Sequence, residues 1–212
     1  MNSFHNVILD LGGVVLDINY NLTRDAFIKL GFRDFEVIYS QLKQELIFDL
    51  FETGKISAPD FRDVIRSYAE KSFSDNEIDA AWNAMIIDLP TERVAFLRKL
   101  KNSFRVFLLS NTNDIHEKEF LRNITAAFGK NILDELFEKT YYSHQTGFRK
   151  PQPEIFKLIL DENSIVAGET LFIDDSPQHV EGANRAGLKG VLLDHSQTTL
   201  EKLIEEVAGI KL

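Results

Sequence analysis

The sequence predicts an α/β fold: a doubly wound parallel sheet with a subdomain of helices inserted into it. Two observations predict this class. In the second half of the chain, short and uniformly apolar segments alternate with helical patterns, as in consecutive βαβ units. Residues 18–88 instead carry apolar spacings typical of helices and no convincing strand.

Each expected strand is short and almost wholly apolar. Such segments suit parallel strands that are covered on both faces, whereas a half-exposed strand would alternate polar and apolar residues. The expected strands are Val7–Leu9, Val106–Leu109, Thr140–Tyr142, Leu171–Ile173 and Val191–Leu193.

Helices are expected between the later strands, over Val94–Leu100, Pro153–Leu160 and Pro177–Ala186. In the last of these, Ser176 is a good N-cap residue before a proline at the first helical position. Gly187 lies where a left-handed residue would end that helix. The spacing therefore predicts both ends of this helix.

The insertion is predicted to be a four-helix subdomain. Ser57–Asp60 and Ser74–Glu77 resemble capping boxes, and each precedes apolar residues at helical offsets. Earlier helices are expected near Leu22–Leu30 and over Phe35–Leu50. We therefore assign residues 1–17 and 89–212 to the α/β core and residues 18–88 to the helical insertion.

Composition narrows the class of protein. With 44% hydrophobic residues among 212, the chain can bury a sizeable core. The absence of cysteine excludes thiolate chemistry, and the net charge of −9 argues against binding to nucleic acid. No secretory leader and no apolar run of the ~18 residues that a membrane span needs are evident, so we expect a cytoplasmic protein without membrane association.

Polar residues follow the predicted strands, at the sheet edge where ligands bind in such folds. Asp10 follows the first strand, and Asp174 and Asp175 follow the fourth. Carboxylates this close repel one another, and a bound Mg²⁺ ion is the simplest way to neutralise their charge. Ser110 and Asn111, after the second strand, could hold a phosphoryl oxygen through hydroxyl and backbone N–H groups.

Lys150 and Arg149 fit as groups that neutralise the acids. Four ordered segments then resemble the motifs of the haloacid dehalogenase superfamily, and the insertion resembles its helical cap. The resemblance covers essentially the whole chain and implies a Rossmann-like core. The segments are residues 7–14, 108–111, 150–156 and 172–176.

The resemblance implies a role for each matching residue. Asp10 would be the nucleophile that attacks phosphorus and becomes an aspartyl phosphate. Ser110 and Lys150 would hold the transferring phosphoryl group. Asp10, Asp175 and the Gly12 carbonyl would bind Mg²⁺, with Asp174 as a neighbouring or water-mediated contact. The implied function is a phosphatase of a small phosphorylated metabolite.

Gly12 departs from the family pattern, because phosphatases of this family usually carry a second aspartate there as general acid. Its absence predicts a slow enzyme or an easy leaving group such as a sugar 1-phosphate, and relatives with a similar start resemble glucose-1-phosphate phosphatases. A water or Asp17 could substitute as the acid. Asp17, Asn19 and Tyr20 could face the substrate from the cap connection, and His144 from the loop before Lys150.

Two other readings stay open at this point. Metal-free 2-haloacid dehalogenases of the superfamily also lack the second aspartate, but the paired Asp174 and Asp175 argue against them. A non-catalytic binding protein is the second alternative, although such a protein has no need for Lys150 or Asp175. The expected partner is a small phosphorylated molecule, and the expected state is a monomer or a homodimer.

Overall fold

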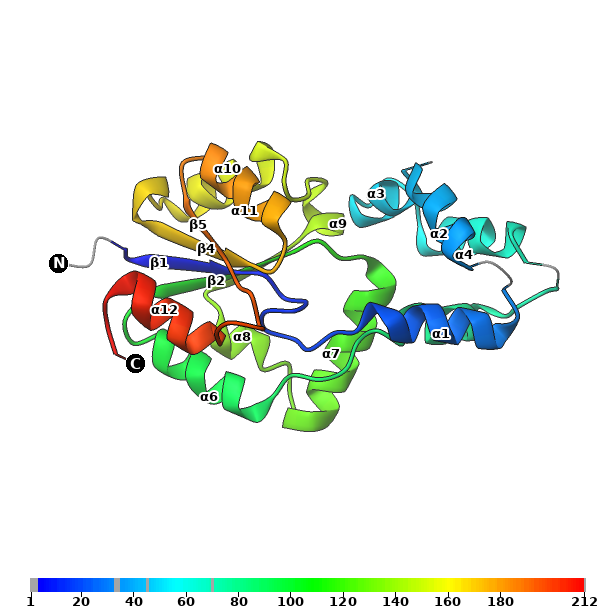
Figure 1. Ribbon diagram of the computed structural model, residues 1–212, viewed down its shortest axis with the longest axis horizontal. Helices are drawn as coiled ribbons and strands as arrows, with labels where there is room; N and C mark the ends of the chain where they lie inside the picture. The colour runs from blue at the N-terminus through cyan, green and yellow to red at the C-terminus, as the bar shows by residue number, and fades with distance from the viewer. Residues whose placement is uncertain (1–3, 33–34, 45, 70, 212) are drawn as a thin grey trace.

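The computed structural model describes residues 4–32, 35–44, 46–69 and 71–211. Its centre is a parallel sheet in the order β3-β2-β1-β4-β5 (Figure 1). From β1 the chain builds outward through β2 and β3 and then returns to the other side of β1 for β4 and β5. This confirms the doubly wound sheet. The strands are β1 (Asn6–Leu9), β2 (Arg105–Ser110), β3 (Lys139–Tyr142), β4 (Thr170–Asp174) and β5 (Lys189–Leu192).

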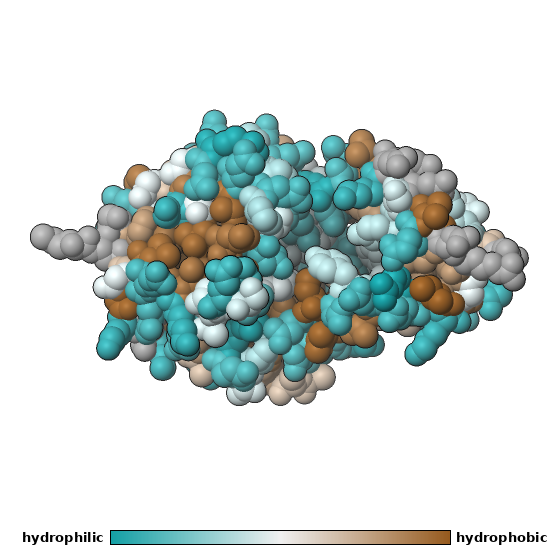
Figure 2. Space-filling view, viewed as in Figure 1, coloured by the Kyte–Doolittle hydropathy of each residue, from teal (hydrophilic) through white to brown (hydrophobic). Residues whose placement is uncertain are grey.

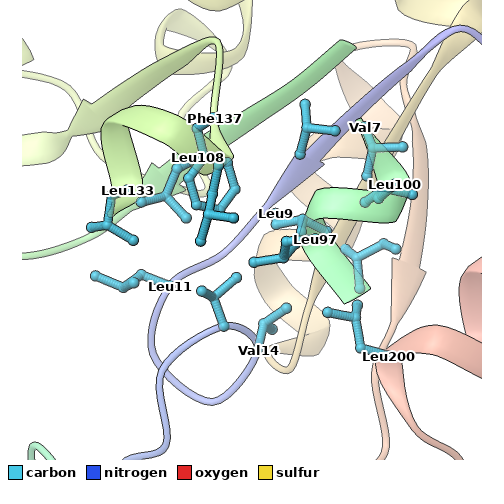
Figure 3. Close-up of a cluster of buried hydrophobic side chains, with 14 of the residues drawn as sticks. Val7, Leu9, Leu11, Val14, Leu97, Leu100, Leu108, Leu133, Phe137 and Leu200 are labelled. Carbon is cyan, nitrogen blue, oxygen red and sulfur yellow. The ribbon is translucent and has the colours of Figure 1, made fainter. Parts of the chain in front are cut away.

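Alternate residues of each inner strand enter two separate cores, because successive side chains of a strand point to opposite faces. Val7 and Leu9 of β1 join Leu97, Leu100 and other residues on one face (Figure 3), whereas Ile8 joins the cluster on the other. The first face is covered by α6 (Thr91–Leu100), α8 (Leu133–Leu136) and α12 (Leu200–Ala208), and the second by α10 (Pro153–Asn163) and α11 (Pro177–Arg185). The sheet is thus a buried central layer.

The expectation that every strand is covered on both faces is wrong for β5. This strand lies at the edge of the sheet and begins at Lys189, two residues before the predicted start. Lys189 is exposed and Leu192 is 40% exposed, since no further strand lies beyond them. Leu193, which was expected to end the strand, follows it and is buried.

The inserted segment is helical, as expected, but the count of four helices is not confirmed. Five helices form among its described residues, because Leu46 adopts a left-handed backbone (φ 58°) and separates two helices within the expected Phe35–Leu50 helix. Residue 45 of that helix lies outside the described residues. The five are α1 (Tyr20–Leu30), α2 (Phe35–Gln44), α3 (Ile47–Glu52), α4 (Ala58–Ser67) and α5 (Asp75–Asn83).

Both predicted capping boxes are confirmed, at the starts of α4 and α5. The helices of the insertion enclose an aromatic core of their own, in which Phe51 stacks on Phe61 with ring centroids 4.3 Å apart. Ile115 of α7 (Asp114–Phe128) also belongs to this cluster. The insertion is thus a second packed unit that rests on α7 of the sheet domain.

Two antiparallel segments join the insertion to the sheet domain. The Asp17 N–H donates to the Asp88 carbonyl at 2.8 Å, and the Ile87 N–H donates to the Asp17 carbonyl at 3.0 Å. These bonds lie beside the boundaries at residues 18 and 88, and we propose that division on this ground. In the described part of the chain, no helix is long and apolar enough to cross a membrane.

Candidate active site

The site lies where the sheet changes direction, at the carboxyl ends of the neighbouring strands β1 and β4. Asp10 directly follows β1, and Asp174 and Asp175 lie at the end of β4. Oxygen atoms of these three side chains all lie within 4.8 Å of one another. The structure therefore brings together the acids that the sequence singled out.

Lys150 is the cation at the centre of this cluster. Its Nζ donates to Asp10 Oδ1 at 2.5 Å, to Asp174 Oδ2 at 2.7 Å and to the Leu109 carbonyl at 3.0 Å. The lysine side chain is only 1% exposed. Burial opposes its charge, but Asp10 and Asp174 outweigh burial and raise the pKa of Lys150 above its usual value. A buried ammonium is thus held beside the expected nucleophile.

The two aspartates that Lys150 contacts differ in their pKa. Burial raises the pKa of Asp10 to about 7; Lys150 opposes that shift, and the charge of Asp174 adds to it. Burial also opposes ionisation of Asp174, but Lys150 and His179 outweigh it and hold its pKa well below the usual value. Lys150 thus opposes the effect of burial at both aspartates, and His179 adds to it at Asp174.

Both carboxylate oxygens of Asp174 are engaged. Oδ2 accepts from Lys150, while Oδ1 accepts from the Ser176 N–H at 2.8 Å and lies 3.0 Å from His179 Nδ1. Asp174 thus positions Lys150 and is poorly placed to be a direct metal ligand.

Both expected ends of α11 can be compared with the structure. Ser176 lies at the N-cap as expected, but its side chain makes no capping bond there. Gly187 has the expected left-handed backbone (φ 89°).

Asp175 is exposed and, among the described residues, takes part in no ion pair. Its pKa is raised by partial burial and by the charge of Asp174. Gly13 lies beside it with φ +81°, and a Cβ at that position would collide with the Asp175 carboxylate. The left-handed backbone favours glycine at this position, and any side chain there would have to displace the Asp175 carboxylate.

The three carboxylates outnumber the single ammonium, so the cluster retains negative charge. Hard oxygen donors with an excess of negative charge are what Mg²⁺ prefers, and a bound cation would also favour the ionised form of Asp10. Gly12 lines the same pocket, at the place where its carbonyl is expected to contribute. The residues present therefore fit a magnesium ion.

Ser110 and Asn111 lie at the end of β2, on the other side of Lys150. Ser110 is buried and lines the pocket. The Asn111 amide donates to the Lys150 carbonyl at 2.9 Å and accepts from the Lys150 N–H at 2.9 Å. The side chain of Asn111 thus positions Lys150, and its expected substrate contact stays a prediction for its backbone N–H.

A pocket of about 530 Å³ opens over these residues, between the sheet domain and the insertion. Figure 2 shows the surface hollowed between the two parts of the molecule. From the sheet domain it is lined by Asp10, Gly12, Ser110, Lys150, Asp175 and others, and from the insertion by Tyr20, Arg24, Tyr39, Glu52, Trp82 and others. The insertion thus supplies one wall of the pocket.

Three other residues that the sequence suggested for the site, Asp17, Asn19 and His144, do not line this pocket. Asp17 contacts Arg93 at 2.7 Å and is absent from the lining, so it is poorly placed to act as the missing acid. His144 pairs with Glu117 at 2.8 Å and also lies outside the lining. Of the three polar residues that begin the cap connection, only Tyr20 lines the pocket.

Arg149 was expected to neutralise the acids of the site, but it contacts the insertion instead. Its Nη2 lies 2.9 Å from Glu52 Oε2, and its Nη1 pairs with Asp49. Sequence analysis did not single out Glu52 or the contact of His179 with Asp174. His179 lies five residues after Asp174, in the first turn of α11, and could have been considered for its nearness along the chain, whereas Glu52 carries no local signal.

Known proteins resemble this chain in sequence. A profile of the haloacid dehalogenase-like hydrolase family matches residues 4–187. A D-ribitol-5-phosphate phosphatase of Bacteroides thetaiotaomicron is 31% identical over 184 residues, which cover 87% of this chain and 89% of that protein.

Two solved structures are also similar. One is a haloacid dehalogenase (HAD) family enzyme of Bacteroides thetaiotaomicron in complex with magnesium and inorganic phosphate, which is 38% identical to this chain and superposes with a TM-score of 0.80. The match covers 92% of this chain and 98% of that enzyme's chain. A predicted HAD-like family hydrolase of Porphyromonas gingivalis is 28% identical with a TM-score of 0.84 and covers 97% of this chain and 98% of its own. Both the sheet and the inserted helices thus have counterparts in known folds.

Proposed function

The chain belongs to the haloacid dehalogenase-like hydrolase family, and from that premise we propose that it is a Mg²⁺-dependent phosphatase of a small sugar or sugar-alcohol phosphate. The family and the phosphatase names of its relatives support the class of phosphoric monoester hydrolase. The observation that carries the proposal is the contact of Lys150 with Asp10, beside the open carboxylate of Asp175.

In this proposal, Asp10 attacks the phosphorus atom in line with the leaving oxygen and forms an aspartyl phosphate. Lys150 and Ser110 hold the phosphoryl oxygens and stabilise the charge on them. Asp10, Asp175 and the Gly12 carbonyl would hold Mg²⁺, which neutralises further oxygen charge when bound. Water then attacks the aspartyl phosphate and releases inorganic phosphate and the Asp10 carboxylate.

The proposed substrate class rests on the pocket and on a relative. A volume of about 530 Å³ suits a small metabolite, and the wall from the insertion offers polar side chains such as Tyr20, Arg24 and Glu52 to hydroxyl groups. The D-ribitol-5-phosphate phosphatase is named for a sugar-alcohol phosphate. Sugar 1-phosphates, which the Gly12 substitution favours, share the same hydroxyl chemistry.

The test is hydrolysis of p-nitrophenyl phosphate with Mg²⁺ or with EDTA, because its leaving group needs no proton. We expect turnover with Mg²⁺ that is lost with EDTA and in Asp10→Asn, but kept in Asp161→Asn, which alters an exposed aspartate of α10. Absence of turnover by folded protein would refute the phosphatase. Halide release from 2-chloropropionate in EDTA would instead identify the dehalogenase, and Mg²⁺ binding without any turnover the non-catalytic protein.

A further inference from the structure

Glu52 is a partly buried carboxylate in the pocket, with a side chain 23% exposed, and the chemistry above gives it no role. It ends α3 and lines the same pocket as Asp10 and Lys150. Its Oε2 atom is shielded from solvent; Arg149 Nη2 lies 2.9 Å from it, but no contact of hydrogen-bond geometry reaches it in the described part of the chain. A shielded carboxylate oxygen with an ion-pair contact but no well-formed hydrogen bond is incompletely satisfied, and such groups concentrate at functional sites.

The charges around Glu52 leave it able to bind and release a proton. Arg149 lies 2.9 Å from Oε2, but this guanidinium also pairs with Asp49, so its charge is shared. Across the pocket, Lys150 lowers the pKa of Glu52 and Asp10 raises it, while Glu52 in turn raises the pKa of Tyr39. Burial is the largest cause, and it raises the pKa of Glu52 to about 7. A proton donor and acceptor works best when its pKa lies near the working pH.

The site needs such a group, because no carboxyl stands at position 12. A sugar-alcohol phosphate leaves as an alkoxide, which must take up a proton as its bond to phosphorus breaks. Asp17 binds Arg93 outside the pocket and cannot supply that proton directly. Glu52 lines the pocket from the insertion, whereas Asp10 lines it from the sheet domain, and the two are close enough that the charge of Asp10 raises the pKa of Glu52.

Resting on the phosphatase function above, we propose that Glu52 of the insertion is the general acid and base of the reaction. As Asp10 attacks, the bond from phosphorus to the leaving oxygen breaks, its electron pair stays on that oxygen, and the oxygen takes the proton of Glu52. The resulting carboxylate then takes a proton from the water that attacks the aspartyl phosphate. Glu52 ends the cycle protonated again, and the products are the alcohol and inorganic phosphate.

The test compares two substrates in two variants. Glu52→Gln should lower kcat/KM for an alkyl ester such as ribitol 5-phosphate by about 10²- to 10⁴-fold, the usual worth of general acid catalysis. It should change kcat/KM for p-nitrophenyl phosphate by less than about threefold, because kcat/KM reports the steps up to release of nitrophenolate, which needs no proton. Asp49→Asn, which removes the other carboxylate partner of Arg149, is the matched control and should affect both substrates equally.

The pH profile separates catalysis from a structural role. In the wild-type enzyme, kcat/KM for the alkyl ester should fall as pH rises through about 7, where Glu52 loses its proton, and this fall should be absent in Glu52→Gln. Glu52→Asp should recover part of the rate on the alkyl ester. An equal loss of kcat/KM on both substrates, or an unchanged pH profile, would overturn the role of Glu52. Loss of all wild-type turnover of p-nitrophenyl phosphate would instead refute the phosphatase itself.

Discussion

Replacement of Lys150 by methionine tests the charge balance at the centre of the site. Methionine fills similar volume but leaves Asp10 and Asp174 buried without the ammonium that lies 2.5 Å and 2.7 Å from them. Removing one partner of a buried ion pair costs about 3–5 kcal/mol of the free energy of unfolding. For a chain of this size, that loss lowers Tm by about 6–20 °C.

The assay is thermal and urea unfolding in EDTA at several pH values, with Lys157→Met, which alters an exposed lysine of α10, as control. Burial raises the pKa of Asp10, and Lys150 keeps that rise smaller than burial alone would make it. The free energy of unfolding lost in Lys150→Met should therefore be largest above pH 7, where wild-type Asp10 is ionised, and smaller near pH 5. Excess Mg²⁺ should restore part of the stability, because it compensates the same carboxylates. A loss below about 1 kcal/mol at pH 8 would refute this charge balance, since that is the size of an exposed pair.

Three further changes have definite expected outcomes. Gly13→Ala forces a Cβ into the Asp175 carboxylate and should weaken Mg²⁺ binding measured by calorimetry at least tenfold; unchanged affinity would contradict the proposed ligand. Phe61→Ala removes a fully buried ring and should lower the free energy of unfolding by about 3–5 kcal/mol in urea titrations; a loss below about 1 kcal/mol would argue against a tightly packed cap. Gly12→Asp, whose Cβ would lie 3.1 Å from the flexible end of Ile18, should raise turnover of ribitol 5-phosphate in Glu52→Gln; no rescue would argue against a missing acid at position 12.

The sequence predicted the sheet and its cluster of acids because both depend on local patterns. A parallel strand buried on both faces is an unbroken apolar segment, and Asp10, Asp174 and Asp175 follow such segments directly. Strands that run parallel end at one edge, so position along the chain places these side chains together. Capping boxes such as Ser57–Asp60 could be predicted for the same reason.

The features that sequence analysis missed depend on contacts between distant parts of the chain. Arg149 pairs with Asp49, which lies 100 residues away in the sequence. No sequence pattern indicates that Arg149 binds this residue and not the acids at the sheet edge. The shielded oxygen of Glu52, whose Arg149 contact lacks hydrogen-bond geometry, exists only once α3 is packed over the pocket. The break at Leu46 was hidden because the apolar spacing of α2 continues into α3.

Arg149 and Lys150 are consecutive residues whose side chains bind two different parts of the molecule. Arg149 is tied to α3 of the insertion, and Lys150 to the acids at the sheet edge. Near them, the backbone at Gly54 passes so close to the His144 carbonyl that a Cβ would collide with it. Movement of α3 away from the sheet domain would therefore have to break the pairs of Arg149 with Asp49 and Glu52. The contact of the insertion with the sheet domain and the position of the buried ammonium thus depend on two adjacent residues of one loop.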